Sequence, residues 1–172
     1  VDPARRDGDG RKVVALSDCE PDVVRLEEQM SAKADNIMIK CSPMLDITLA
    51  SRQLKCVEAV HVVAVNNECK ELLFVLRRNN SCGCSIHCVN ILKDGMQQFV
   101  FAQADEASSA IAYSNGVGKY LYEPNSAIQK AGCSRVLAER FGIKKLHANS
   151  QVYTADILLP DFQGRVFEVV EV

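Results

Sequence analysis

Apolar and polar residues alternate along the first part of the chain in a way that indicates helices and strands in turn. Residues 21–33, PDVVRLEEQMSAK, carry an apolar stripe with a charged back, which is typical of an amphipathic helix. Residues 36–41, NIMIKC, form a nearly continuous apolar run, so they suit a strand covered on both faces, as in a parallel sheet. Ser42-Pro43 breaks this run, and the pattern predicts a second helix over residues 44–54.

Two pairs of strand-like runs follow, and each pair is joined by a turn signal. VEAVHVVAVNN and KELLFVLRR meet at residues 66–69, NNEC, which indicates an antiparallel hairpin. SIHCVNILK and QQFVFAQ are joined across Asp94-Gly95, which indicates a second hairpin. The stretch RRNNSCGCS between the pairs is polar and contains glycine, so it predicts a domain boundary near residues 79–81.

The last third of the chain contains one long segment with helical spacing, residues 125–142. Asn125 or Ser126 can cap its start, and Gly142 can end it. Gly132 lies within the pattern, where it can break or bend the helix.

The order of these segments predicts an α/β fold in two domains. Residues 1–80 would form an incomplete Rossmann-like half, whose mixed sheet ends in an antiparallel hairpin. Residues 81–172 would form a small α+β domain, with short strands at residues 144–148 and in the terminal run RVFEVVEV. A half sheet exposes a strand edge with unpaired N–H and C=O groups, so we expect a homo-oligomer in which that edge is covered.

The composition is ordinary for a globular protein. The chain has 172 residues, of which 48% are hydrophobic and 24% charged, and its formal net charge is −2. This balance gives no global basic field, so any RNA contact would need a local patch. The cysteines lie mostly within apolar runs such as NIMIKC and IHCVN, which indicates small core residues and a reducing, cytoplasmic compartment. No apolar run approaches the ~18 residues of a membrane span, so no membrane contact is expected.

The opening residues, VDPARR, have the form of a strand end followed by a turn. Val1 would close a buried strand, and Asp2 and Pro3 would lie at its carboxyl end, where open α/β sheets place their ligand chemistry. A carboxylate oxygen and a rigid carbonyl there could accept the N–H groups of an amine or a base edge. Arg5 and Arg6 could bind phosphate. On composition alone, an ordinary loop with solvated arginines is the simpler interpretation.

The chain resembles a known family through several motifs that together span almost its whole length. The motifs are DPARR, KCSPMLDI, AVHVVAVNNECKELLFVL, YLYEPNSAIQKAG, KLHANSQVYTAD and PDFQGRVFEV. They are similar to the C-terminal portion of class I S-adenosylmethionine-dependent methyltransferase-like proteins of Bacteroides-type bacteria, which carry a C-terminal THUMP-like domain. The combination of motifs carries the resemblance, because no single motif is specific.

The resemblance implies that DPAR stands where amino-methylating enzymes have Asn/Asp-Pro-Pro-aromatic, beside the sulfonium of the cofactor. Asp2 and Pro3 match the first two positions and would border the methyl-transfer site as the catalytic residues. Ala4 replaces the second proline, and Arg5 replaces the aromatic residue that would stack on a flat base. This departure leaves methylation of an exocyclic amine open.

The cofactor half of that family's site has no counterpart in this sequence. The family has a glycine-rich turn after its first strand and an acidic residue after its second. The nearest glycine cluster here, residues 115–119, NGVGK, lacks the spacing and the trailing Ser/Thr of a P-loop. We therefore expect S-adenosylmethionine to be bound by a longer parent protein and not by this chain alone.

Two further stretches carry residue types that occur at active or metal sites. Ser42 and Pro43 would lie on the rim of the same crevice, or they merely stop the strand. A nucleophilic Cys41 or Ser42 would need a nearby base, which the sequence does not supply. The residues Cys82, Cys84 and Cys88, with His87 beside them, are spaced C-x-C-x3-C rather than in the C-x2-C pairs of structural zinc sites, so no metal is expected.

Basic and aromatic side chains gather between residues 119 and 153. Basic groups contact phosphate and aromatic rings stack on unpaired bases, so this mixture fits RNA. A solvated helix face with tyrosines in a small core is the alternative. THUMP domains are associated with RNA binding, so the resemblance favours RNA. The group comprises Lys119, Lys130, Arg135, Arg140, Lys144, Lys145, Tyr120, Tyr122 and Tyr153, of which Lys119, Tyr122, Arg140, Lys144 and Lys145 are the predicted substrate-binding residues.

The sequence therefore predicts part of a methyltransferase that acts on RNA, with the parent protein as the enzyme and this chain alone inactive. Asp2 could orient a nitrogen donor or act as a base. The alternative is a non-catalytic RNA-binding or protein-interaction module on a methyltransferase-like scaffold, which the departures at Ala4 and Arg5 favour.

Overall fold

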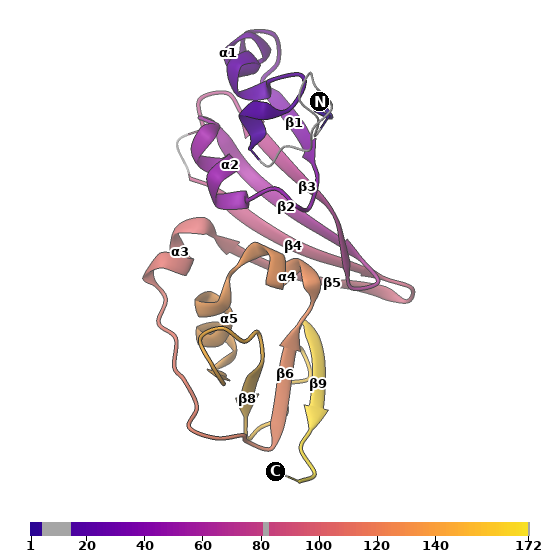
Figure 1. The fold of residues 1–172 in the computed structure, drawn as a ribbon, viewed down its shortest axis with the longest axis vertical. Coiled ribbons are helices and arrows are strands. Elements are labelled where there is room, and N and C mark those ends of the chain that lie inside the picture. Colours follow the sequence, from indigo (N-terminus) through magenta and orange to yellow (C-terminus); the bar gives the residue numbers. More distant parts are fainter. Residues whose placement is uncertain (5–14, 81–82, 172) are drawn as a thin grey trace.

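The structure is a computed structural model that describes residues 1–4, 15–80 and 83–171. Within these residues the strands form two sheets that follow each other along the long axis of the molecule (Figure 1). The predicted phosphate-binding residues Arg5 and Arg6 lie outside the described residues, as does Cys82.

The first sheet has the strand order β1-β3-β2-β4-β5. Its strands are β1 (Asn36–Cys41), β2 (Val57–Val65), β3 (Glu68–Arg77), β4 (Ser85–Leu92) and β5 (Gly95–Ala102). Neighbouring strands are antiparallel except β2 and β4, which run parallel. The sheet is therefore mixed, as the sequence predicts.

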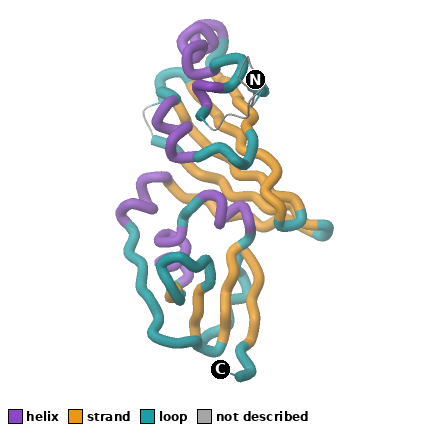
Figure 2. Tube along the Cα trace, in the orientation of Figure 1, coloured by secondary structure: helices purple, strands orange, loops and turns teal. Residues whose placement is uncertain are grey.

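Both predicted hairpins are present in this sheet. Asn66 and Asn67 connect β2 to β3 with φ values of 49° and 62°, the left-handed pair that a tight two-residue turn requires. The β4–β5 turn lies at the same end, because β2 and β4 are parallel, and the two turns project together (Figure 2). The N–H of Asn66 donates to the carbonyl of Ile91 at 2.8 Å, which joins the two hairpins.

The predicted domain boundary at residues 80/81 falls inside this sheet. The β4–β5 hairpin, which the sequence analysis assigns to the second domain, pairs with β2 from Ala59↔Ser85 to Val65↔Ile91. The polar stretch before β4 connects β3 to β4, which lie on either side of β2 in one sheet, so it does not link two domains. The change from one sheet to the next lies between Ala102 and Tyr120.

Helices cover one face of the first sheet. They are α1 (Val23–Lys33) and α2 (Ile47–Gln53), with a 3-10 turn at Leu16–Asp18 before them. Asp22 caps α1 by accepting the N–H of Arg25 at 3.1 Å. Asp46 caps α2 by accepting the N–H of Leu49 at 2.8 Å, so this helix begins later than the sequence pattern predicts.

Strand β1 is buried on one face only. Ile37, Ile39 and Cys41 point into the core, whereas Met38 is 55% exposed on the other face. The expectation of a strand covered on both faces was therefore wrong for the described residues. Met38 is apolar but exposed, so the apolar run alone did not show whether one face or both faces of β1 are covered.

The second sheet has the order β7-β8-β6-β9 and is antiparallel throughout. Helix α3 (Gln103–Ser108) leads to it from β5. The elements that follow are β6 (Tyr120–Pro124), α4 (Ser126–Ala131), α5 (Ser134–Phe141), β7 (Lys144–Lys145), β8 (Tyr153–Ala155) and β9 (Gly164–Glu168). The long predicted helix is divided into α4 and α5 at Gly132, whose φ is 69°.

The two sheets share one hydrophobic core. Helix α4 follows β6 but packs against β2, β3 and β4 of the first sheet, where Ala127 and Ile128 are buried. Polar contacts reinforce this junction: the N–H of Ser126 donates to Asn67 Oδ1 at 2.8 Å, and the N–H of Gln98 donates to Gln163 Oε1 at 3.0 Å. The two halves are thus packed as one body.

Candidate functional site

Val1 lies against the free edge of β1. Its amino group donates to the carbonyl of Met38 at 2.7 Å, and its carbonyl accepts the N–H of Lys40 at 2.8 Å. These two bonds flank Ile39 in the pattern of parallel strands. Val1 thus has the position expected of the last residue of a strand, and Asp2 follows at the carboxyl end of the sheet.

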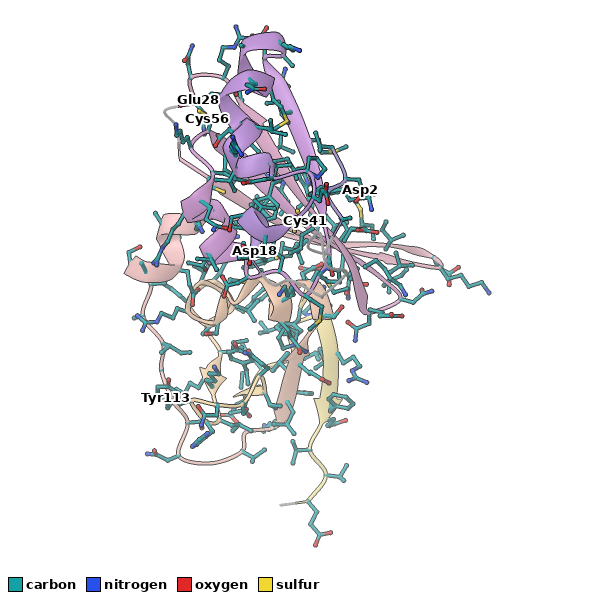
Figure 3. The ribbon with its side chains drawn as sticks, turned by 45° about the horizontal axis from the view of Figure 1, so that its top comes forward. Asp2, Asp18, Glu28, Cys41, Cys56 and Tyr113 are labelled. Carbon is teal, nitrogen blue, oxygen red and sulfur yellow. The ribbon has the colours of Figure 1, made fainter. Side chains whose placement is uncertain are left out.

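The turn after Val1 is held in place by its neighbours. Pro3 is buried, and Ala4 pairs with Glu20 through two backbone hydrogen bonds of 2.7 and 3.1 Å. Asp2 remains exposed between these fixed points. The backbone therefore presents the Asp2 carboxylate at the end of β1, close to the place where Cys41 ends that strand (Figure 3).

The structure brings the two predicted rims together around a shallow cavity of about 350 Å³. Asp2, Pro3 and Ala4 line one side, and Ser42 and Pro43 line another. The remaining lining residues are Lys40, Lys70 and Glu71. These three residues were not predicted from the sequence, although Lys40 is the only charged residue in the run NIMIKC.

Lys40 organises the charges at this cavity. Its Nζ lies 2.8 Å from Asp2 Oδ2 and 3.8 Å from Glu71 Oε2. The hydrogen bond to Asp2 raises the pKa of Lys40, so the ammonium stays protonated at neutral pH. The ammonium contacts one oxygen of the Asp2 carboxylate, which leaves lone pairs of that carboxylate available to an N–H donor.

Neither Cys41 nor Ser42 is activated as a nucleophile. Burial raises the pKa of the Cys41 thiol to about 12, so it remains protonated. Ser42 Oγ accepts the N–H of Met44 at 3.2 Å, and Asp46 caps α2. These residues stop β1 and start the next helix.

The structure removes Tyr122 and Lys145 from the predicted RNA surface. Tyr122 is fully buried, and its hydroxyl donates to the carbonyl of Ile157. Lys145 is 5% exposed, and its Nζ donates to the carbonyl of Ala148 at 3.0 Å. Alternation along β6 and β7 turns both side chains inward, a signal that residue type alone does not contain. Tyr153 is buried as well.

Three predicted substrate-binding residues remain exposed: Lys119, Arg140 and Lys144. Arg140 is occupied, because its Nη1 donates to the carbonyl of Val100 at 2.6 Å and its guanidinium lies 4.7 Å from the centre of the Phe99 ring. Lys144 pairs with Thr154 of β8, and Lys119 directly precedes β6, which pairs with the same strand from the other side. Neither lysine forms an ion pair with another described residue, so both are free to meet a phosphate, as is Arg135 of the same predicted surface.

The cysteine and histidine motif does not form a cluster. His87 and Cys88 point to opposite faces of β4, and His87 stacks on His61 with ring centroids 4.5 Å apart. Burial and the neighbouring His87 lower the pKa of His61. Across residues 1–4, 15–80 and 83–171, no three His, Cys, Asp or Glu side chains lie close enough together to hold a metal ion.

Similar proteins are methyltransferases by description. A model of a ferredoxin-like domain matches residues 120–162, which run from β6 to just before β9. Two proteins of Mycobacterium tuberculosis, from strains CDC 1551 and H37Rv, are each 26% identical over 171 residues and cover 99% of this chain. Both are described as uncharacterized S-adenosylmethionine-dependent methyltransferases, and the chain spans 44% of their length.

A crystal structure of a protein from Porphyromonas gingivalis W83, proposed to be a methyltransferase, has the same fold. It matches with a TM-score of 0.90 and 38% sequence identity over 99% of this chain and 42% of its own length. No helix in the part of the chain that the structure describes is long and apolar enough to span a membrane. The match to this crystal structure confirms the α/β fold predicted from the sequence. The similarity to S-adenosylmethionine-dependent methyltransferases extends along the whole chain.

Proposed function

We propose that this chain is the C-terminal part of an S-adenosylmethionine-dependent methyltransferase that acts on RNA. The observation that carries the proposal is the cavity at the carboxyl end of β1, where Asp2 and Pro3 meet Ser42 and Pro43. The fold shared with a protein proposed to be a methyltransferase supports it. So does the parallel pairing of Val1 with β1, since a strand preceding Val1 would lie along that edge.

The described residues fit one side of a cofactor site. Asp2 and Glu71 place two carboxylates at the cavity and Lys40 and Lys70 place two ammonium groups there, so the lining can contact groups of either charge on a cofactor. Two backbone donors of the glycine cluster are already used: the N–H of Gly118 donates to Thr154 Oγ1 at 2.8 Å, and that of Lys119 to Asp156 Oδ1 at 3.2 Å. We therefore assign the rest of the cofactor site to residues that precede this segment in the longer relatives.

Asp2 would act by orientation. When bound, the cofactor supplies an electrophilic methyl group. The Asp2 carboxylate, held by Lys40, accepts an N–H of the acceptor and aims its lone pair, while the buried Pro3 fixes the backbone. Positioning of this kind supplies much of the rate of a group transfer.

Replacing Asp2 with alanine is expected to lower methyl transfer by about 100-fold, because the acceptor loses its orienting group. The measurement is transfer of a radiolabelled methyl group from S-adenosylmethionine to RNA by the complete gene product. Asp35→Ala is the matched control, since Asp35 is an exposed, ion-paired aspartate far from the cavity, bonded to Arg78 at 3.4 Å. Equal rates for wild type and Asp2→Ala would contradict the assignment.

A non-catalytic RNA-binding module is the second candidate, favoured by Ala4 in place of the family's second proline. In both cases the THUMP-like character expected of the second half would present Lys119 and Lys144 to RNA.

The double variant Lys119→Glu/Lys144→Glu is expected to weaken binding of a structured RNA by about tenfold at low salt. The control is Lys93→Glu, at an exposed lysine on the β4–β5 turn. Unchanged affinity in a filter-binding assay would exclude this surface.

The chain on its own is expected to form a homo-oligomer through the free edge of β1. Unpaired backbone groups on a strand edge recruit a second strand, and Val1 covers only the middle of this one. Light scattering checks this, and a monomer at all concentrations would contradict it.

We also propose a cytoplasmic location, which the absence of disulfides among the described cysteines supports.

A further inference from the structure

A second cavity, of about 420 Å³, lies at the junction between the two sheets. Figure 1 shows α2 facing α3 and α4 across this junction. Ile86 and Phe101 line its apolar part. Thr48, Ser51 and Arg52 line it from α2, Gln103 and Glu106 from α3, and Arg135 from α5. Both halves of the molecule thus contribute polar groups to one space.

The two arginines of this cavity are available to a ligand. Arg77, Arg78 and Arg165 each pair with a carboxylate elsewhere in the structure. By contrast, the guanidinium groups of Arg52 and Arg135 make no ion pair with another described residue. Both side chains are exposed, so a ligand can reach them from solvent.

The one carboxylate that lines this cavity, that of Glu106, is bound by backbone N–H groups. Glu106 accepts the backbone N–H of Arg135 at 3.0 and 3.1 Å and that of Val136 at 3.0 Å, so it caps the start of α5. Its charge is therefore offset by the helix N-terminus. The guanidinium groups keep a net attraction for anions.

The two arginines together form a donor set that recognises phosphate, because guanidinium binds phosphate oxygens in a bidentate manner.

We propose that the cavity between α2, α3 and α5 binds the phosphate of a nucleotide, through Arg52 and Arg135. Its volume is within the range of small-ligand sites, so it accommodates more than the phosphate alone. The nucleotide is either free or part of an RNA strand. The proposal does not depend on methyl transfer.

Isothermal titration calorimetry at low salt with 5′-AMP, inorganic phosphate and a ten-nucleotide RNA tests the site. Wild type is expected to bind 5′-AMP or the RNA in the millimolar range or tighter. Arg52→Gln and Arg135→Gln should each weaken binding about tenfold, and the double variant should abolish it. Tighter binding of 5′-AMP supports a free nucleotide, and tighter binding of the RNA supports a strand.

Arg25→Gln is the matched control, because Arg25 is an exposed arginine on α1 that does not line the cavity. It should bind like wild type. Absence of binding by wild type for all three probes, or binding retained by the double variant, overturns the proposal. The titration contains no S-adenosylmethionine, so its failure is distinct from a failure of the methyltransferase assignment.

Discussion

Replacing Glu27 with alanine is expected to lower the free energy of unfolding by about 3 kcal/mol. Glu27 lies on α1 and is 3% exposed. Its carboxylate accepts the backbone N–H of Lys55 at 2.9 and 3.1 Å and that of Cys56 at 3.2 Å, so it ties α1 to the chain that enters β2. Alanine would leave both N–H groups without an acceptor. Urea denaturation monitored by circular dichroism measures the loss.

The adjacent Glu28 provides the control. It is also on α1, but its side chain is 81% exposed and its contact is a surface ion pair of 2.6 Å with Lys55 (Figure 3 labels Glu28 beside Cys56). Exposed pairs of this kind contribute little, so Glu28→Ala should leave the denaturation midpoint unchanged. If both variants were equally stable, the proposed role of the Glu27 carboxylate would be refuted.

A second large loss of stability, about 3 kcal/mol or more, is expected for Gly164→Ala. Gly164 begins β9, where the chain passes close to the end of β6. An added Cβ would overlap the carbonyl oxygen of Glu123 and lie 2.8 Å from the Cα of Pro124 and 2.9 Å from Cε1 of Phe162. Two of these neighbours are backbone atoms, which cannot rotate away.

Gly116→Ala is the matched substitution for this test. An added Cβ at Gly116 meets no atom within 4 Å, and the residue is exposed. Its midpoint in thermal denaturation should stay close to that of wild type, whereas that of Gly164→Ala falls. Similar midpoints for the two variants would show that β9 can shift away from β6 without loss.

The parts of the fold that depend on local signals could be predicted from the sequence. The asparagine pair at residues 66–67 specified the first hairpin, and Gly132 and Gly142 marked where helices end. The parallel pairing of β2 with β4 could not be predicted, because paired residues of the two strands are more than 20 residues apart in the sequence. Strand β3 and a polar stretch lie between them. That pairing is why the predicted boundary at residues 80/81 falls within a sheet.

The same division applies to the candidate site. Asp2 and Ser42 could be placed on one rim because each follows a strand, and parallel strands bring their carboxyl ends together. Glu71 could not be placed at this cavity from the sequence. Its approach to Lys40 depends on the antiparallel register of β1 and β3, in which Lys40 faces Leu73. Tyr122 was misplaced because residue type was weighed without the in-and-out alternation of β6.

Helix α4 packs against the first sheet, and this packing limits how the two sheets can move relative to each other. Because Ile128 is buried between the sheets, the ferredoxin-like half cannot swing relative to the first sheet without exposing apolar surface to water. The two sheets are therefore expected to move as a unit, because separating them would cost the burial of Ile128.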